Sequence, residues 1–164
     1  MTATYDLIYS NVLGTNQTSI TISGLGSSYR DLVLVIDGQG GNGDFYPRLR
    51  FNSDTGNNYS WVSGEGNGSS ASSFNGSPEN GQQIANGVFF STTSRTLIIC
   101  NIMDYSATDK SKTILSRANR ANQATEMIAG RWNNNSAITS IQLYSGNGNS
   151  IAAATTIYLY GIVS

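Results

Sequence analysis

Short β-type segments, separated by frequent turn signals, run through the whole of this 164-residue sequence. Asn-Gly pairs, which supply the positive φ angles of tight hairpin turns, recur between the segments. No apolar stripe of helical spacing is sustained between them. The pattern predicts an all-β fold, a jelly-roll-like antiparallel β-sandwich with little or no helix. The expected strands cover residues 6–9, 19–22, 31–36, 48–51, 59–62, 88–91, 96–103, 113–118, 126–132, 138–144 and 156–162.

Alternation of side-chain type within these segments indicates which strands are half-buried. In residues 156–162, small and apolar positions alternate with Tyr158 and Tyr160, as in a strand with one face on the core. Residues 32–36 and 97–102 are continuous apolar runs, which are typical of strands in the middle of a packed sheet. The sequence therefore predicts that these two segments are strands in the middle of the sheet.

The length suits a single domain, residues 1–164, with a core large enough to fold without a disulfide or a metal. Residues 64–82 are rich in Gly, Ser and Asn and are predicted to form a long surface loop, with a linker between two domains as the alternative. Residues 115–128 are the best helical candidate, but they lack an apolar face, so we expect strand and turn there. Residues 1–9 could dock on a neighbouring subunit.

Charge is scarce in this chain. Charged residues make up 12% of the sequence, the net charge is −1, and the scattered basic residues give no basic face for nucleic acid. Low net charge provides little self-repulsion, which favours association into an assembly. The sequence has no apolar run of membrane-spanning length and no signal-peptide pattern at residues 1–13. We expect a soluble protein, without a membrane partner, made in the cytoplasm of its host.

The sequence offers little for nucleophilic or metal-dependent catalysis. Histidine is absent, so neither a Ser-His-Asp triad nor a Cys-His pair can form. Cys100, the single cysteine, lies in an apolar run and is expected to be a small buried side chain. Residues 52–58 lack the acidic ligands of a calcium loop. We predict no catalytic residue, no metal site and no cofactor.

A converging pair of carboxylates, as in glycosidases, is the alternative that the sequence leaves open. Asp54, Asp104 and Glu126 are the candidates for such a pair. Aspartates that follow strands are more simply explained as caps of turns, because their side chains accept hydrogen bonds from nearby backbone amides.

Aromatic side chains provide the remaining candidate sites. Flat rings and neutral amides suit a carbohydrate, and Trp61 and Trp132 are the candidates for that site, although aromatic residues in sandwich strands more often pack in the core. Tyrosine is also enriched at protein interfaces. The tyrosines expected to contact a neighbouring subunit are Tyr5, Tyr9, Tyr144, Tyr158 and Tyr160, of which the last three are expected to face outward.

Several stretches of the sequence, in a fixed order, resemble small virion structural proteins of tailed bacteriophages, including cyanophages. They are residues 49–61 (LRFNSDTGNNYSW), residues 129–132 (AGRW) followed by residues 137–141 (AITSI), and residues 159–162 (LYGI). This resemblance implies a jelly-roll β-sandwich on the phage particle, as in capsid decoration (cement) proteins, head fibres and tail-fibre tips. It carries no catalytic residues.

The resemblance is compatible with more than one function. Because β-type patterning begins by Asp6 and no shaft repeat is present, we expect a capsid decoration protein on the outer capsid surface of the virion. Such a protein would bind the major capsid protein, form a homotrimer and stabilise the shell. The alternative is a tail-fibre or receptor-binding module that recognises a host surface glycan through Trp61, Trp132 and residues 64–82. A glycan-cleaving enzyme is a third hypothesis.

Overall fold

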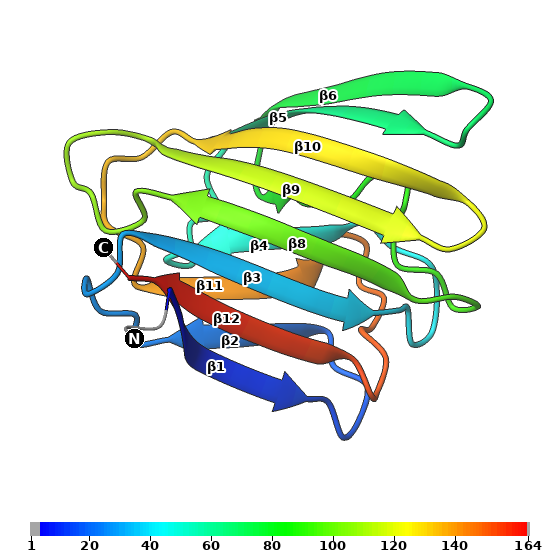
Figure 1. The fold of residues 1–164 in the computed structure, drawn as a ribbon, viewed down its shortest axis with the longest axis horizontal. Helices are drawn as coiled ribbons and strands as arrows, with labels where there is room; N and C mark the ends of the chain where they lie inside the picture. The colour runs from blue at the N-terminus through cyan, green and yellow to red at the C-terminus, as the bar shows by residue number, and fades with distance from the viewer. Residues whose placement is uncertain (1–3, 164) are drawn as a thin grey trace.

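The computed structural model describes residues 4–163, and every regular element in that part of the chain is a β-strand (Figure 1). Within residues 4–163 there is no helix that could span a membrane. In chain order the strands are β1 (Tyr5–Val12), β2 (Ser19–Ser23), β3 (Asp31–Gly38), β4 (Pro47–Phe51), β5 (Tyr59–Gly66), β6 (Ala71–Glu79), β7 (Gln82–Gln83), β8 (Thr96–Met103), β9 (Lys112–Arg120), β10 (Ala124–Trp132), β11 (Ser140–Ser145) and β12 (Thr156–Ile162).

The strands form two antiparallel sheets that pack face to face. The large sheet has eight strands in the order β1-β12-β3-β8-β9-β10-β5-β6, and the small sheet has four in the order β2-β11-β4-β7. Figure 1 shows the large sheet in front, with β4, β11 and β2 behind it. The predicted all-β, jelly-roll-like antiparallel sandwich is confirmed.

The core lies between the sheets because each facing strand turns one set of alternating side chains inward. From the large sheet, β3 contributes Leu34 and Ile36, and from the small sheet β4 and β11 contribute Leu49 and Leu143. Cys100 of β8 is also fully buried, as predicted, and burial raises the pKa of its thiol to about 12.

An aromatic cluster fills the core near the end of β10. Trp132 stacks on Tyr59 with ring centroids 6.3 Å apart, and its ring lies 5.5 Å from that of Phe51. Trp132 is 1% exposed. The cluster joins β10 and β5 of the large sheet to β4 of the small sheet, so it ties the two layers together.

Asp54 holds the connection between β4 and β5 in place. Its carboxylate accepts hydrogen bonds from the backbone amide of Gly56 (2.8 Å), the side-chain amide of Asn58 (2.9 Å) and Nε1 of Trp132 (2.8 Å). Burial raises the pKa of this carboxyl, but the hydrogen bonds outweigh that effect and hold the pKa below its ordinary value of 3.8. Asp54 is therefore a turn-capping residue.

The low pKa of Asp54 predicts a loss of stability in acid. A carboxyl whose pKa is lower in the folded than in the unfolded chain stabilises the fold fully above the unfolded pKa, and this contribution disappears as pH falls through the folded pKa. At neutral pH, Asp54→Asn should lower the free energy of unfolding by about 1–3 kcal/mol. Urea denaturation of both proteins from neutral pH to about pH 2 should show that this difference shrinks in acid. A difference that is independent of pH would contradict the role of the charge.

Polar side chains beneath β9 and β10 anchor the segment that follows β7. The buried carboxylate of Glu126 accepts hydrogen bonds from the backbone amides of Asn86 (2.7 Å) and Val88 (3.4 Å). The hydroxyl of Ser116 donates to the carbonyl oxygen of Ile84 at 2.7 Å. These bonds satisfy backbone groups that would otherwise be buried without partners.

The prediction of a surface loop at residues 64–82 is wrong. β5 continues to Gly66, and the chain turns where the side chain of Asn67 accepts hydrogen bonds from the backbone amides of Ser69 and Ser70. It then returns as β6, which pairs with β5, and β7 follows. Because β6 is an edge strand exposed on both faces, its sequence has no apolar alternation, and pairing with β5 overrides its low intrinsic β-propensity.

The other strand predictions hold with one exception. Residues 88–91 form no strand, since their only ladder contact is a single bridge between Phe45 and Phe90. Residues 138–144 begin pairing only at Ser140. The helical candidate at residues 115–128 is the hairpin of β9 and β10, as expected.

Candidate binding surfaces

The outer face of the large sheet is apolar across its central strands. The antiparallel register aligns outward side chains of successive strands in rows that cross the sheet. One row is Leu7, Tyr160, Val33, Asn101, Leu115, Ala129 and Val62, and the next is Tyr158, Val35, Ile99, Arg117 and Met127. These two rows together with Tyr5 are called the apolar sheet face below.

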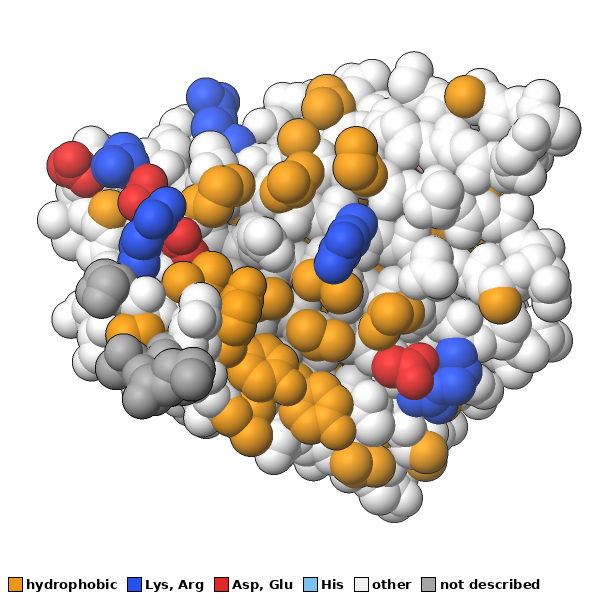
Figure 2. Space-filling view, viewed as in Figure 1, with side chains coloured by type: hydrophobic (Ala, Val, Ile, Leu, Met, Phe, Trp, Pro, Cys, Tyr) orange, Lys and Arg blue, Asp and Glu red, His pale blue; other side chains and the backbone are white. Residues whose placement is uncertain are grey.

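Solvent reaches large parts of the apolar sheet face. Met127 is 63% exposed and Leu115 is 45% exposed. Figure 2 shows hydrophobic side chains gathered in a band across this side of the molecule, with most charged groups towards the margins. An open hollow of about 720 Å³ lies within the band, between Tyr5, Tyr160 and Met127.

Apolar residues are unusual on the solvent side of an antiparallel sheet, which normally carries polar side chains. In β3, Leu34 points into the core, yet Val33 and Val35 on the opposite face are apolar as well. Single exposed hydrophobic residues are common on monomers, but a contiguous band of them marks a surface that binds another molecule. The apolar sheet face therefore has the properties of an interface.

Arg117 lies within the apolar sheet face. Its cross-strand neighbours are Ile99 and Met127, and it forms no ion pair within residues 4–163. A molecule seated on this face would remove water from the guanidinium group. Complementarity then requires a carboxylate, or another hydrogen-bond acceptor, opposite Arg117.

Three of the tyrosines predicted to contact a neighbour lie together on the apolar sheet face. The rings of Tyr5 and Tyr160 meet edge to face with centroids 6.5 Å apart, and those of Tyr158 and Tyr160 stack at 6.3 Å. Tyr5 belongs to β1, an edge strand paired only with β12. Residues 1–3 of the predicted docking segment lie outside the described residues.

The two other predicted tyrosines lie elsewhere. A β-bulge between Leu7 and Tyr9 shifts the alternation of β1, so Tyr9 packs against the core and not on the outer face. Tyr144 belongs to the small sheet and is 7% exposed, because the guanidinium of Arg50 covers its ring. Tyr144 does point to the outer side of this sheet, as expected, because it pairs with Arg48 and lines the hollow in front of it, but little of its ring is open to solvent.

Trp61 and Trp132 do not form a carbohydrate platform. Trp132 lies in the aromatic cluster of the core, and Trp61 is buried against Gly76 of β6. Both occupy inward positions of β5 and β10, where no flat ring is presented to solvent. Their interpretation as core residues is the correct one.

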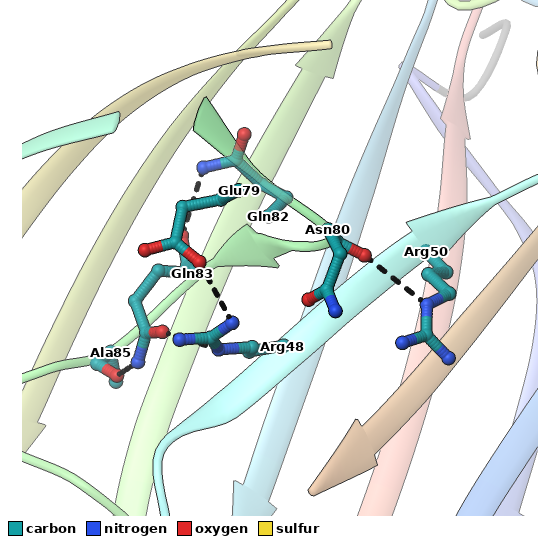
Figure 3. Close-up of polar contacts among 7 residues, drawn as sticks. All are labelled: Arg48, Arg50, Glu79, Asn80, Gln82, Gln83 and Ala85. Atoms are coloured by element: carbon teal, nitrogen blue, oxygen red, sulfur yellow. Dashed lines mark hydrogen bonds and ion pairs between the residues drawn. The ribbon is translucent and has the colours of Figure 1, made fainter. Parts of the chain in front are cut away.

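A polar pocket lies on the outer side of the small sheet (Figure 3). In β4, Leu49 and Phe51 point into the core, so the alternate residues Arg48 and Arg50 point outward. The hollow in front of them measures about 460 Å³. We call it the arginine pocket; besides the two arginines it is lined by Tyr46, Asn57, Glu79, Asn80, Tyr144 and Asn147.

Both arginines of this pocket are held in place. Nε of Arg48 donates to Oε1 of Gln83 at 2.9 Å, and its Nη1 donates to Oε2 of Glu79 at 3.1 Å. Nε of Arg50 donates to the carbonyl oxygen of Asn80 at 3.2 Å, and its guanidinium carbon lies 4.1 Å from the ring centre of Tyr144. Figure 3 shows both side chains beside the turn that joins β6 to β7.

Gly81 in that turn is required by the ring of Tyr144. A Cβ atom at this position would lie 2.0 Å from the hydroxyl oxygen of Tyr144, which is closer than any real contact. An alanine at this position would displace either the turn or the ring on which Arg50 is stacked. Gly81→Ala should therefore disorder the arginine pocket, which a changed Arg50 Nε resonance in an NMR spectrum would reveal; an unchanged resonance would contradict this role.

The candidate catalytic acids do not form a site. Asp54 binds Trp132 at one end of β10, whereas Glu126 lies near the other end, roughly 20 Å away. Asp104 forms an exposed ion pair with Lys110 at 3.4 Å. Within residues 4–163, no three His, Cys, Asp or Glu side chains come together in a way that could hold a metal ion.

Two carboxylates that were not predicted to meet, those of Glu65 and Glu126, lie on neighbouring strands. Glu65 of β5 lies directly opposite Glu126 of β10. The hollow beside Glu65 measures about 110 Å³, below the ~300–1,000 Å³ of ligand pockets. Glu126 is buried under the backbone amides that it binds. Glu126 therefore holds the segment around Gly87 in place, and the carboxylate of Glu65 lies against Gly87.

Comparison with known proteins gives no family. No protein-family model matches the sequence, and no curated protein matches it significantly. The similar solved structures include the marine PL-14 alginate lyase from Aplysia kurodai, which is 11% identical, with 85% of this chain and 72% of that chain covered and a TM-score of 0.39. They also include the galectin LEC-6 from Caenorhabditis elegans, 12% identical, with 94% and 96% covered and a TM-score of 0.35. These likenesses concern the sandwich fold and have no bearing on function.

Proposed function

We propose that this chain is a non-enzymatic structural protein of a tailed-phage particle, a capsid decoration protein that docks on the outer shell through the apolar sheet face. The observation that carries the proposal is the contiguous apolar band across the outer side of the large sheet. Binding through such a surface needs shape complementarity and buried apolar area, and no reactive group.

The charge of the apolar sheet face favours a different protein as the partner. In a two-fold pairing of copies through this face, both copies of Arg117 would be buried in the same interface and would repel each other, because the two rows contain no carboxylate to pair with them. A shell protein that offers a carboxylate opposite Arg117 avoids this repulsion. We therefore assign the face to the major capsid protein, and the predicted homotrimer would use other surfaces.

The assignment to a virion rests on the sequence resemblance at residues 49–61, 129–132, 137–141 and 159–162. The structure adds a physical reason for a structural role. The candidate acids do not converge, because Asp54 is hydrogen-bonded to Trp132 at one end of β10 and the buried Glu126 is bonded to backbone amides near the other. The few charges on the outer face of the large sheet also give no basic surface for nucleic acid.

Copy number per particle tests this proposal. Quantitative mass spectrometry of purified particles that encode this chain should find it in hundreds of copies, and images of the particle should place it on the shell. A handful of copies, with density at the tail, would contradict the decoration role. That outcome would support the alternative, a tail-fibre or receptor-binding module for a host glycan, for which the arginine pocket now replaces Trp61 and Trp132 as the candidate site.

A further inference from the structure

The guanidinium group of Arg50 is held in one orientation but keeps free donors. Its Nε is bonded to the carbonyl oxygen of Asn80, and its plane is packed over the ring of Tyr144. Its terminal amino groups, Nη1 and Nη2, form no hydrogen bond within residues 4–163. A fixed planar guanidinium with unused donors matches the two oxygen atoms of a carboxylate, and little side-chain entropy is lost when it binds.

The charges of the arginine pocket favour a ligand with a single negative charge. Arg48 is neutralised by Glu79, with which it forms an ion pair at 3.1 Å. Arg50 is therefore the one uncompensated charge of the pocket. A phosphate dianion would be repelled by the nearby carboxylate of Glu79, whereas one carboxylate group balances Arg50.

The remaining lining of the pocket suits hydroxyl groups and a sugar ring. The side chain of Asn57 is exposed and makes no hydrogen bond within the described residues, and the same holds for the side chain of Asn80. Asn147 also lines the pocket, but its amide is already bonded to Ser145, Asn149 and the carbonyl oxygen of Asp44. Tyr46 presents a half-exposed ring that is braced by Phe89, with centroids 5.7 Å apart. The unbonded amides of Asn57 and Asn80 can bind hydroxyl groups, and the hollow of about 460 Å³ is of the size that holds a small ring ligand.

We propose that the arginine pocket is a binding site for a saccharide that carries a carboxylate, a uronic acid unit of an acidic polysaccharide. Arg50 binds the carboxylate, the amides at the rim bind ring hydroxyl groups, and Tyr46 packs against the ring. This site lies on the small sheet, on the side of the sandwich opposite to the apolar sheet face.

Titration of the full chain with trigalacturonic acid tests the proposal, with the fully methyl-esterified trimer as the matched neutral ligand. Calorimetry should show saturable binding of the acid and a loss of affinity of about tenfold or more for the ester, because the charged hydrogen bonds are absent. NMR amide shifts should be confined to residues 46–50, 57, 79–81 and 144–147. No saturable binding, equal binding of the ester, or equal binding of a triaspartate peptide would overturn the proposal; the last would indicate a peptide ligand.

Substitutions distinguish a loss of binding at this site from a general loss of folding. Arg50→Gln should abolish binding, and Arg50→Lys should weaken it strongly because lysine keeps the charge but lacks the planar fork. Asn57→Ala removes an exposed amide that makes no bond within the described residues, so it should weaken binding while the thermal midpoint stays unchanged. Arg131→Gln, which removes an exposed arginine of β10 on the large sheet, should bind as wild type does. If Arg50→Gln fails to fold, Asn57→Ala decides, and wild-type affinity in that variant would refute the assigned pocket.

Discussion

Lysine in place of both Leu115 and Met127 is expected to weaken docking on the capsid shell by about a thousandfold or more. These side chains lie in adjacent rows of the apolar sheet face, so a seated partner would bury two unpaired charges. In the free protein they are largely exposed, so the fold should lose only about 0.5 kcal/mol for each change. Co-sedimentation with particles that lack the protein measures the effect, with thermal unfolding as the check on folding.

The matched control for this variant is Phe74→Lys. Phe74 is 44% exposed, but it lies on β6, opposite Ser63, whose side chain points to the inner side of the large sheet. A lysine there adds one positive charge, as each change of the double variant does, without touching the apolar sheet face, and docking should be unchanged. If the double-lysine variant sediments with particles as well as wild type does, the apolar sheet face is not the docking surface.

Trp132→Ala is expected to lower the free energy of unfolding by about 3–5 kcal/mol, the range for removal of a fully buried large aromatic residue. The change empties the space between Phe51 and Tyr59 and removes the hydrogen bond that Nε1 donates to Asp54. For a domain with a total stability of about 5–15 kcal/mol, this is a large fraction. Equilibrium denaturation in urea measures it.

Trp132→Phe separates the two contributions of that residue. Phenylalanine keeps most of the ring in the cluster but cannot donate to Asp54, so it should cost less than alanine. A loss below about 1 kcal/mol for Trp132→Ala would contradict the role of this cluster in joining the sheets.

The sequence predicts most of the fold because two physical signals are local. Period-two alternation identified β12 correctly, and continuous apolar runs identified β3 and β8. β6 was missed because an edge strand with both faces in solvent needs no apolar side chains. Residues 88–91 were assigned to a strand because Val88 and Phe90 are apolar. Both side chains are buried, but they belong to an irregular segment that Glu126 holds in place.

The candidate surfaces could be predicted only in part, because they depend on register. Alternation within β12 placed Tyr158 and Tyr160 on one face correctly. It could not show that Leu115 and Met127 join them, since that follows from the order of strands in the sheet. A bulge, which has no signal in the sequence pattern, turned Tyr9 inward.

The arginine pocket could not be predicted from the sequence for a similar reason. Its residues come from β4 and the connections on either side of it, from the end of β6 and the turn that follows, and from β11 and the loop after it, which are distant in the sequence. The alternation of Arg48 and Arg50 with Leu49 and Phe51 was the one available signal, since it shows that both arginines share the outer face of a strand.

The proposed function requires that another protein covers the apolar sheet face in the assembled particle. Hydroxyl-radical footprinting, applied to the free protein and to intact particles, tests this claim through oxidation of Met127. We predict that its oxidation falls several-fold in particles, while modification of Phe74 on β6 is unchanged. Equal oxidation of Met127 in both samples would show that the apolar sheet face stays open to water, which would contradict docking through this face.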